Sequence, residues 1–519
     1  MAGFRSRSES QRSQNSQKSQ PRRGQDGGRA KGYQQRRPQE RQEKPKLRGS
    51  GDAVRDVALS VLRQVTEEDA YANLVAPQAI RRAGLKGRDA AFATELIYGS
   101  LRATGLLDAV IALAAGREVE KIDSMALDIL RLGTYQILRT RVEDHAAVDT
   151  SVNLAKAFGA QRASGFINGV LRTVTRTPAE DWVARVAGGS GIADVSLRHA
   201  HPAWIGEVFN ESLGGSSTSI APDLEEALTA DDARPIVHLA ARPGLMSAEE
   251  LALVSGGTEG RFSPYAVYVD DGAPRDLDPI KEKLASVQDE GSQLIALTLV
   301  RAALDKQDTG RWLDLCAGPG GKTAFIGSWA VGEGAAVDAV EITPHRATLI
   351  SQALDADMPV TVHVGDGRKL QDIDSLDYPD GGFDRILVDA PCSGLGALRR
   401  RPEARWRKTL GDVPQLVALQ RELLTAAYEA VAPGGVVVYS TCSPHRAETS
   451  DVVRFVAHKT GARIEDARQV LPELKDTTTT AAGGEDQFIQ LWPHRHGTDA
   501  MFIAVLTKPV EQQAHRTVG

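Results

Sequence analysis

The 519-residue sequence has little cysteine: only Cys316, Cys392 and Cys442. Three widely separated cysteines cannot build a disulfide framework, and without a C-x-x-C pair there is no start for a zinc site. We therefore expect that the protein binds no metal. We also expect it to reside in a reducing compartment, the cytoplasm.

Long apolar runs are also missing. The longest, near residues 294–304, is interrupted by Thr298 and Arg301, and it is shorter than the ~18–20 residues that a membrane span needs. The N-terminus is positively charged but has no apolar segment behind it, unlike a secretory signal. We expect no membrane partner.

Residues 1–50 have almost no aliphatic side chains, and they carry 14 Lys and Arg against 4 Asp and Glu in a chain of net charge −6. Such a segment cannot bury enough apolar surface to offset its chain entropy, so it is predicted to be a disordered basic tail. Binding to polyanions through phosphates and a solubilising role without a specific partner both fit this composition.

The composition and the residue pattern of the remaining chain change twice. Residues 51–178 place apolar side chains at helical spacing, as in Met125, Ile129 and Leu132, which predicts an all-helical domain. Residues 179–285 combine Gly- and Ser-rich loops with short strand-like runs at 236–240 and 266–269, which predicts a linker and a small α+β accessory unit.

Residues 286–509 alternate strand-like and helical patterns, which predicts an α/β domain with a mostly parallel, doubly wound sheet. A short polar tail, 510–519, follows. The expected strands are 312–316, 336–341, 361–364, 383–389, 436–440 and a last run at 501–507.

A glycine-rich turn follows the first of these strands, in the segment Leu-Asp-Leu-Cys-Ala-Gly-Pro-Gly-Gly-Lys-Thr at 313–323. A Walker A loop is excluded because Cys316 stands where its first glycine is needed, and the G-x-G-x-x-G dinucleotide pattern fails at Thr323. The looser turn of S-adenosylmethionine (SAM) enzymes remains. The candidate cofactor-binding residues of this turn are Cys316, Ala317, Gly318, Pro319, Gly320, Gly321 and Lys322.

Acidic residues stand at the ends of the next three strands: Glu341, Asp366 and Asp389. The carboxyl ends of strands in an open α/β sheet form its ligand-binding edge. There Glu341 can accept hydrogen bonds from ribose hydroxyls and Asp366 from an adenine amino group. One such acid could simply cap a loop, but the succession predicts a cofactor site.

Cys392 and Cys442 lie just past two predicted strands, in loops of Gly, Pro and Ser. A free cysteine is usually a small buried hydrophobe. At this edge of the sheet, however, a thiol can be partly exposed and activated as a thiolate. Both are therefore candidate catalytic residues.

These segments carry a family resemblance. Residues 316–323, 389–396 (Asp-Ala-Pro-Cys-Ser-Gly-Leu-Gly) and 440–443 (Ser-Thr-Cys-Ser) resemble the NSUN (NOL1/NOP2/Sun) family of RNA cytosine-C5 methyltransferases, and residues 55–58 and 166–172 resemble NusB. Together, over residues 52–508, they are similar to the bacterial Sun/Fmu branch. Gly318 replaces the family's usual Ala, which we expect to be harmless. Asp-Ala-Met-Phe at 499–502 replaces Asp-Gly-Phe-Phe, which we expect to alter packing.

The resemblance implies an enzyme with a Rossmann-like, SAM-dependent methyltransferase domain (286–509) after a NusB-like RNA-binding domain (51–178). Its product would be 5-methylcytosine in RNA, and the RNA that the resemblance favours is 16S rRNA. We expect the protein to be a monomer. Cys442 would add to carbon 6 of the base, Cys392 would assist release, and Asp389 would contact the cofactor or the base. The basic segment 399–407, with Trp406 for stacking, would contact RNA.

Two other functions stay open. In a DNA cytosine-C5 methyltransferase the nucleophile is the cysteine of a Pro-Cys motif. In this sequence that motif is Pro391-Cys392, so Cys392 would be the nucleophile. An antitermination-type RNA scaffold would keep the NusB-like domain beside an inactive methyltransferase domain. The second cysteine site at Cys442 and the NusB-like domain favour RNA, and the intact motifs at each strand end favour activity.

Overall fold

The computed structural model describes residues 49–270, 274–475, 477 and 487–510. The predicted disordered tail therefore lies outside the described residues except for its last two positions. All but the first residue of the predicted C-terminal tail, 510–519, also lies outside them.

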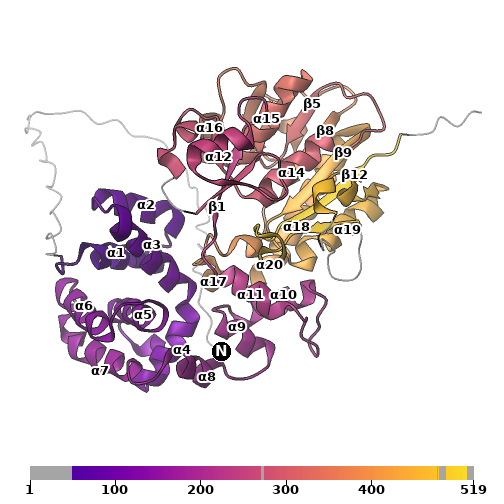
Figure 1. Cartoon of the computed structure of the whole chain (residues 1–519). Helices are drawn as coiled ribbons and strands as arrows, with labels where there is room; N and C mark the ends of the chain where they lie inside the picture. Colours follow the sequence, from indigo (N-terminus) through magenta and orange to yellow (C-terminus); the bar gives the residue numbers. More distant parts are fainter. Residues whose placement is uncertain (1–48, 271–273, 476, 478–486, 511–519) are drawn as a thin grey trace, which may run out of the picture. The chain divides into compact units, whose positions relative to one another are not determined.

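The predicted all-helical domain is confirmed as seven α-helices around one core (Figure 1). Ile129 and Leu132 of the expected stripe are fully buried, and Met125 packs at its edge. Asp123 begins its helix by accepting a hydrogen bond from the Ala126 backbone N–H at 3.1 Å, as an N-cap residue does. The helices are α1 (Ala53–Glu67), α2 (Ala72–Arg82), α3 (Gly87–Arg102), α4 (Thr104–Ala115), α5 (Ser124–Arg139), α6 (Asp144–Ala157) and α7 (Ser164–Val174).

The next segment contains helices where the sequence suggested a linker. They are α8 (Ala179–Ala187), α9 (Ile192–Arg198), α10 (Ala203–Ser212) and α11 (Leu224–Asp232). Ile205, Phe209 and Leu228 from these helices share a core with Trp492 near the C-terminus. The Gly- and Ser-rich stretches are the loops between the helices. Each helix has only 7 to 10 residues. A helical spacing of apolar residues is hard to recognise in the sequence over so few positions.

The small α+β unit is confirmed. Its four-stranded antiparallel sheet has the order β2-β3-β1-β4. The strands are β1 (Val237–Ala241), β2 (Thr258–Glu259), β3 (Ala266–Val269) and β4 (Ala285–Val287), with α12 (Ala248–Ser255) and α13 (Asp278–Lys281).

The C-terminal domain is built on an eight-stranded sheet of order β10-β12-β9-β8-β5-β6-β7, with β11 paired to β12. Strands β5 to β9 are parallel, and β12 pairs antiparallel with β9, β10 and β11. The strands are β5 (Arg311–Asp314), β6 (Ala336–Glu341), β7 (Val360–Val364), β8 (Phe383–Asp389), β9 (Val431–Thr441), β10 (Arg463–Glu465), β11 (Ile489–Gln490) and β12 (Phe502–Thr507). The predicted mostly parallel, doubly wound sheet is confirmed.

Helices cover both faces of this sheet (Figure 1). One face packs against α14 (Glu290–Arg301) and α15 (Gly321–Glu333), and the other against α18 (Val413–Ala430) and α19 (Ser450–Thr460). Alternate residues of the central strands face opposite layers, as in Val438 and Tyr439, since side chains alternate along a strand. The remaining helices are α16 (Pro344–Ala353), α17 (Ala404–Arg407) and α20 (Pro493–His496).

Among the described residues, no single helix is long and apolar enough to cross a membrane. The pair α3 and α4 passes that test only when both are taken together, across a bend of 76°. Their apolar side chains, such as Ile97 and Leu107, are buried in the core of the helical domain.

Candidate functional site

The glycine-rich turn connects β5 to α15 at the carboxyl edge of the sheet. Gly320 has a φ of +107°, and a Cβ atom there would lie 2.8 Å from the Cα of Ile350. Only glycine both adopts this positive φ without strain and leaves room for the backbone of Ile350. The turn therefore passes close to α16 and directs the N-terminus of α15 toward the edge where the acids lie.

Asp314, the last residue of β5, was not predicted as a site residue. Its carboxylate is buried and accepts a hydrogen bond from Thr323 Oγ1 at 2.7 Å, while its second oxygen has no partner among the described residues. Burial raises the pKa of Asp314 from 3.8 to about 7, and the Asp389 carboxylate adds to this. An acid at the end of the first strand was the signal that could have identified it.

Glu341 ends β6 beside the glycine-rich turn. One oxygen accepts from the Thr343 backbone N–H at 2.9 Å, and the other lies 3.3 Å from Arg346 Nη1. Arg346 also donates to the Gly318 carbonyl at 2.5 Å. A Cβ atom at Gly318 would lie 2.2 Å from Glu341 Oε2. An alanine at this position would require the ends of the flexible Glu341 and Arg346 side chains to shift, so the expectation that Gly318 in place of alanine is harmless stays a prediction.

Asp366 follows β7 and is bound by Arg368, whose Nε and Nη2 donate to its two oxygens at 2.9 Å and 2.6 Å. The hydrogen bond from Arg368 holds the pKa of Asp366 below its usual value. Arg368 also lies 2.8 Å from Glu422. Arg346 and Arg368 thus occupy the two carboxylates, and both are partly exposed, with 46% and 39% of their side chains accessible.

Asp389 ends β8 and accepts hydrogen bonds from Lys322 Nζ at 2.7 Å and from Ser440 Oγ at 3.1 Å. Burial opposes the charged form of Lys322, but the Asp389 carboxylate outweighs it and raises the pKa of Lys322 above its usual value. The pair joins the glycine-rich turn to the strand that leads to Cys392.

Cys392 and Cys442 are brought together from two loops, with their Sγ atoms 3.4 Å apart. The hydrogen bond with Cys392 lowers the pKa of the Cys442 thiol below its usual value, although burial and the Asp389 charge oppose the shift. Arg401 and Lys322 favour the same thiolate. The same hydrogen bond, together with burial, raises the pKa of Cys392 well above its usual value. The arrangement favours a Cys442 thiolate that accepts from a Cys392 thiol.

Cys316 in the turn differs from this pair. It packs at the edge of the hydrophobic core beneath the sheet, and burial raises the pKa of its thiol well above the usual value. Its side chain is therefore a packing group with a protonated thiol. Among the described residues there is no group of three or more His, Cys, Asp or Glu that could hold a metal ion.

Most of the basic segment 399–407 is buried or half-buried, and among its arginines only Arg401 is exposed. Arg405 is fully buried and donates to Asp231 Oδ2 at 2.7 Å. Trp406 Nε1 donates to the carbonyls of Leu101 and Arg102 at 3.1 Å and 3.2 Å. The segment is therefore a connection to the helical domain, and stacking of RNA on Trp406 is not available in this arrangement.

The same holds at the start of the segment. Arg399 Nε lies 2.6 Å from Asp499 Oδ1, and Arg400 Nη2 lies 2.7 Å from Asp289 Oδ1. The departure from the family pattern at 499–502 lies here too: Ala500 and Met501 are both buried, and the Ala500 backbone N–H donates to the Gly396 carbonyl at 2.8 Å.

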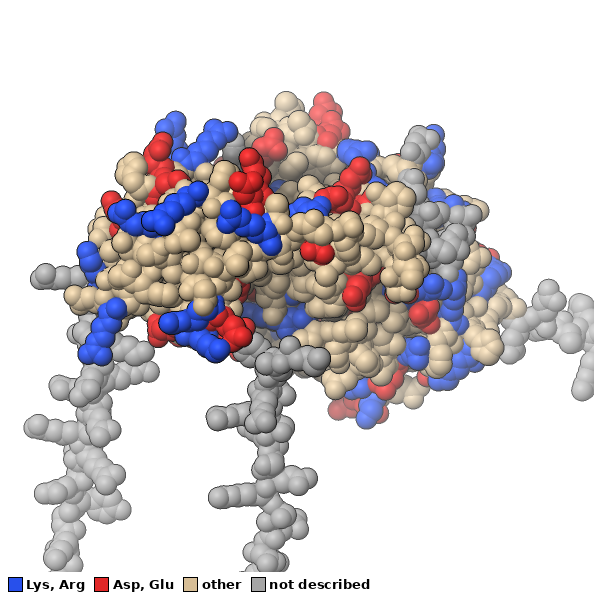
Figure 2. Space-filling model, turned by 90° about the horizontal axis from the view of Figure 1, so that it is seen from below, with Lys and Arg blue, Asp and Glu red and all other residues tan. Residues whose placement is uncertain are grey.

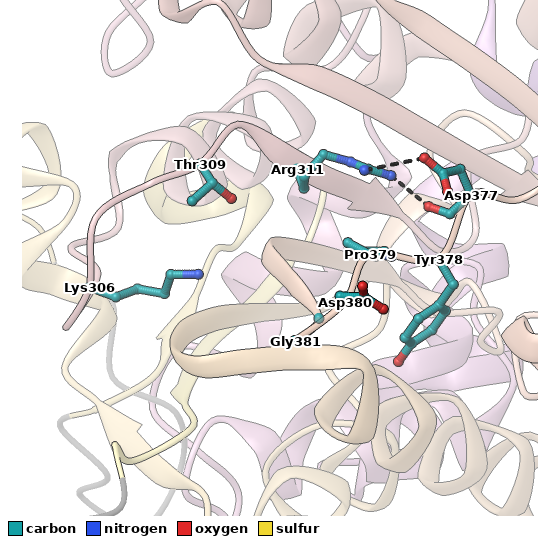
Figure 3. Close-up of a pocket in the computed structure, with 9 residues that line it drawn as sticks. Lys306, Thr309, Arg311, Asp377, Tyr378, Pro379, Asp380 and Gly381 are labelled. Atoms are coloured by element: carbon teal, nitrogen blue, oxygen red, sulfur yellow. Dashed lines mark hydrogen bonds and ion pairs between the residues drawn. The ribbon is translucent and has the colours of Figure 1, made fainter.

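A pocket of about 440 Å³ lies at the opposite edge of the sheet, before β5 and β8 (Figure 3). Its cations are paired with acids: Lys306 lies 2.6 Å from Asp384, and Arg311 contacts Asp377. It holds none of the predicted site residues, so the reaction chemistry lies elsewhere.

The chemistry of the donor and acceptor set fits a nucleoside cofactor. Carboxylates stand at the ends of β5, β6 and β8 and just after β7, and one oxygen of Asp314 is buried without a partner. Hydroxyl, amino and sulfonium groups are ligands that carboxylates can bind. The two thiols lie at the same edge, next to Asp389.

The family model "16S rRNA methyltransferase RsmB/F" matches residues 301–507, and the NusB family model matches residues 52–176. A Mycobacterium tuberculosis protein named "Putative methyltransferase Rv1407" is 51% identical over 460 residues, 88% of this chain and 97% of that protein.

Ribosomal RNA small subunit methyltransferase B of Cronobacter sakazakii is 30% identical over 462 residues, 88% of this chain and 98% of that protein. The crystal structure of PH0851 has the same fold, with a TM-score of 0.71 at 19% identity over 88% of this chain and 98% of that one.

Proposed function

The chain belongs to the RsmB/F family of 16S rRNA methyltransferases, and from this premise we propose that it forms 5-methylcytosine in 16S rRNA with SAM as the methyl donor. The observation that carries the proposal is the pair of thiols, Cys392 and Cys442, 3.4 Å apart at the carboxyl edge of the sheet. We further propose that residues 51–178 and 179–285 help to bind the RNA and that residues 286–509 carry the reaction.

SAM, when bound, supplies the methyl group. Glu341 would hold the ribose hydroxyls and Asp366 the adenine amino group, while the turn at 316–322 would pass close to the rest of the cofactor. Arg346 and Arg368 would then release the two carboxylates, which their exposed side chains permit. Lys322 orients Asp389 from within the turn.

Cys442 is the proposed nucleophile. Its thiolate adds to carbon 6 of the target cytosine, so that the Sγ–C6 bond forms and carbon 5 becomes electron-rich enough to take a methyl group. After methylation Cys392 helps to take up the proton from carbon 5, the C5–H electron pair re-forms the C5=C6 double bond, and the Sγ–C6 bond breaks to release the Cys442 thiolate. Cys392 assists this release, and Asp389, next to both thiols, binds the base or the cofactor.

The lowered pKa of Cys442 supports this division of roles over the DNA-type alternative, in which Cys392 would attack. The pKa of Cys392 is raised by its hydrogen bond with Cys442 and by burial, which suits a group that acts after the bond to carbon 6 has formed. The target base must leave its stack to reach either thiol, so it would be flipped out or unpaired.

In the segment 399–407 only Arg401, whose charge also favours the Cys442 thiolate, is exposed enough to meet a phosphate, so the RNA needs further cations. We propose the end of α2 and the start of α3, where four exposed side chains, Arg81, Arg82, Lys86 and Arg88, form no ion pair within the described part of the chain. On the face shown in Figure 2, by contrast, Lys and Arg are interspersed with Asp and Glu. A local group of unpaired cations favours phosphate contacts.

The test is to map 5-methylcytosine in rRNA from cells with and without the gene, and in rRNA methylated by the purified protein. The proposal expects one or more cytosines of 16S rRNA to lose the mark without the gene and to regain it in vitro with SAM. Methylation only of DNA, or of no nucleic acid despite SAM binding, would contradict it.

A further inference from the structure

A buried carboxylate lies between the two cysteine loops. Glu448 stands in the short helix Arg446–Glu448 that follows the Cys442 loop, and its side chain has no solvent exposure. No ion pair joins it to a cation within the described part of the chain. A carboxylate taken out of water in this way needs hydrogen bonds in place of a counter-ion.

Four donors supply these hydrogen bonds. Glu448 Oε1 accepts from the Ser393 backbone N–H at 2.8 Å and from Gln420 Nε2 at 3.1 Å. Oε2 accepts from Ser393 Oγ at 2.5 Å and from Ser443 Oγ at 2.7 Å. An ionised carboxylate has about four acceptor positions, so the set of donors matches the ionised form.

The two serines are the residues directly after the two cysteines: Ser393 follows Cys392, and Ser443 follows Cys442. Their hydroxyls also lie 3.1 Å from one another. Gln420 of α18 ties Glu448 to the same loop a second time, because its Nε2 donates to the Pro391 carbonyl at 2.9 Å. One carboxylate therefore fixes the backbone on both sides of the gap between the sulfurs.

We propose that Glu448 is a positioning residue, whose ionised carboxylate binds Ser393 and Ser443 and so holds the two thiols at hydrogen-bonding distance, with the proton on Cys392. This inference rests on the proposed function, since it assigns how the same pair of cysteines is prepared for different roles. Nothing in it requires Glu448 to touch RNA or SAM.

The charge of Glu448 acts in the same direction as its geometry. The carboxylate contributes to the raised pKa of Cys392, after the hydrogen bond to Cys442, burial and the charge of Cys442 itself. The charged groups that act on Cys442 are instead Asp389, Arg401 and Lys322. Removing Glu448 would loosen the sulfur pair and would ease deprotonation of Cys392, and both changes reduce the preference for a Cys442 thiolate.

The experiment compares the full-length protein with Glu448→Gln. Because thiolates and not thiols react with iodoacetamide, limiting reagent followed by peptide mass spectrometry gives the ratio of modification at Cys442 to that at Cys392. We expect the ratio to fall about tenfold, the change for one unit of relative pKa. We also expect kcat on rRNA to fall roughly 10- to 100-fold, the range for a lost hydrogen bond to a charged group, with KM and SAM affinity within about twofold, because Glu448 contacts neither ligand.

The matched control is Asp384→Asn. Asp384 is also a fully buried carboxylate, on β8, and at the opposite edge of the sheet it accepts from the Thr309 N–H and hydroxyl and from the Arg311 N–H; unlike Glu448, it also pairs with a cation, Lys306. It should lower thermal stability without changing the modification ratio. A Glu448→Gln protein with the parental ratio and the parental kcat would overturn the inference.

If Glu448→Gln does not fold, Ser393→Ala and Ser443→Ala each remove one hydroxyl donor and keep the buried charge. A ratio unchanged in both would equally overturn it. The modification ratio needs no RNA and no methyl transfer, so it decides the role of Glu448 even if the parent protein proves inactive on 16S rRNA, which would contradict only the proposed function.

Discussion

The indole ring of Trp406 lies directly against Gly105 of α4, where a Cβ atom would fall 2.2 Å from the ring carbon Cη2. Only a residue without a side chain leaves room for the ring. The loop that carries Cys392 is thus joined, through the segment 399–407, to the helical domain.

Gly105→Val should displace Trp406 and lower the free energy of unfolding by about 1–3 kcal/mol, as overpacking does. Gly169→Ala in α7 is the matched control, because a Cβ atom there meets nothing within 4 Å and alanine is the better helix former. Calorimetry should show a lower Tm for Gly105→Val alone. Equal Tm values for both variants and the parent would contradict the role of this contact.

Cys442→Ala and Cys392→Ala should leave different products. Without Cys442 the bond to carbon 6 cannot form, so no covalent RNA adduct is expected. Without Cys392 the protein should attack and methylate but release slowly, so a denaturant-resistant complex should accumulate. A denaturing gel after incubation with rRNA and SAM measures this. An adduct only in Cys442→Ala would reverse the assignment of the two thiols.

Glu341→Ala and Asp366→Ala should each weaken SAM binding roughly tenfold to a hundredfold, because each loses charge-assisted hydrogen bonds worth about 1.5–3 kcal/mol. Glu422→Ala is the control, since Glu422 shares Arg368 with Asp366 but is itself exposed. Calorimetric titration with SAM gives the dissociation constants. Values in both site variants equal to that of Glu422→Ala would contradict the cofactor site.

Asp314 should make stability depend on pH. Its folded-state pKa is raised to about 7, so between about pH 4 and 7 the folded protein holds a proton that the unfolded chain has lost. Stability from this group is therefore present at low pH and is lost as the pH rises toward 7. In Asp314→Asn this loss should be absent. Between pH 5 and pH 8 the free energy of unfolding of the parent should therefore fall relative to that of the variant by on the order of a few kcal/mol. Thermal unfolding at the two pH values measures it, and parallel pH profiles would contradict the raised pKa.

The sequence by itself determined the elements whose signals are local. The strands at 312–316, 336–341 and 383–389 were predicted from strand-like runs, which the structure places at 311–314, 336–341 and 383–389, and the glycine-rich turn was predicted from its spacing. The carboxyl edge of the sheet followed from the alternation of strands and helices, which is why Glu341, Asp389 and both loop cysteines could be placed near one another in advance.

Only the tertiary structure decided which charged groups are partnered. The arginines of 399–407 are as basic in sequence as a phosphate-binding segment, yet Arg405 meets Asp231 and Arg400 meets Asp289, each more than 100 positions away along the chain. The same is true of the two thiols, 50 residues apart in sequence. Sequence spacing cannot tell which sulfur donates and which accepts, because that depends on burial and on neighbours such as Lys322 and Glu448, which only the folded chain brings together.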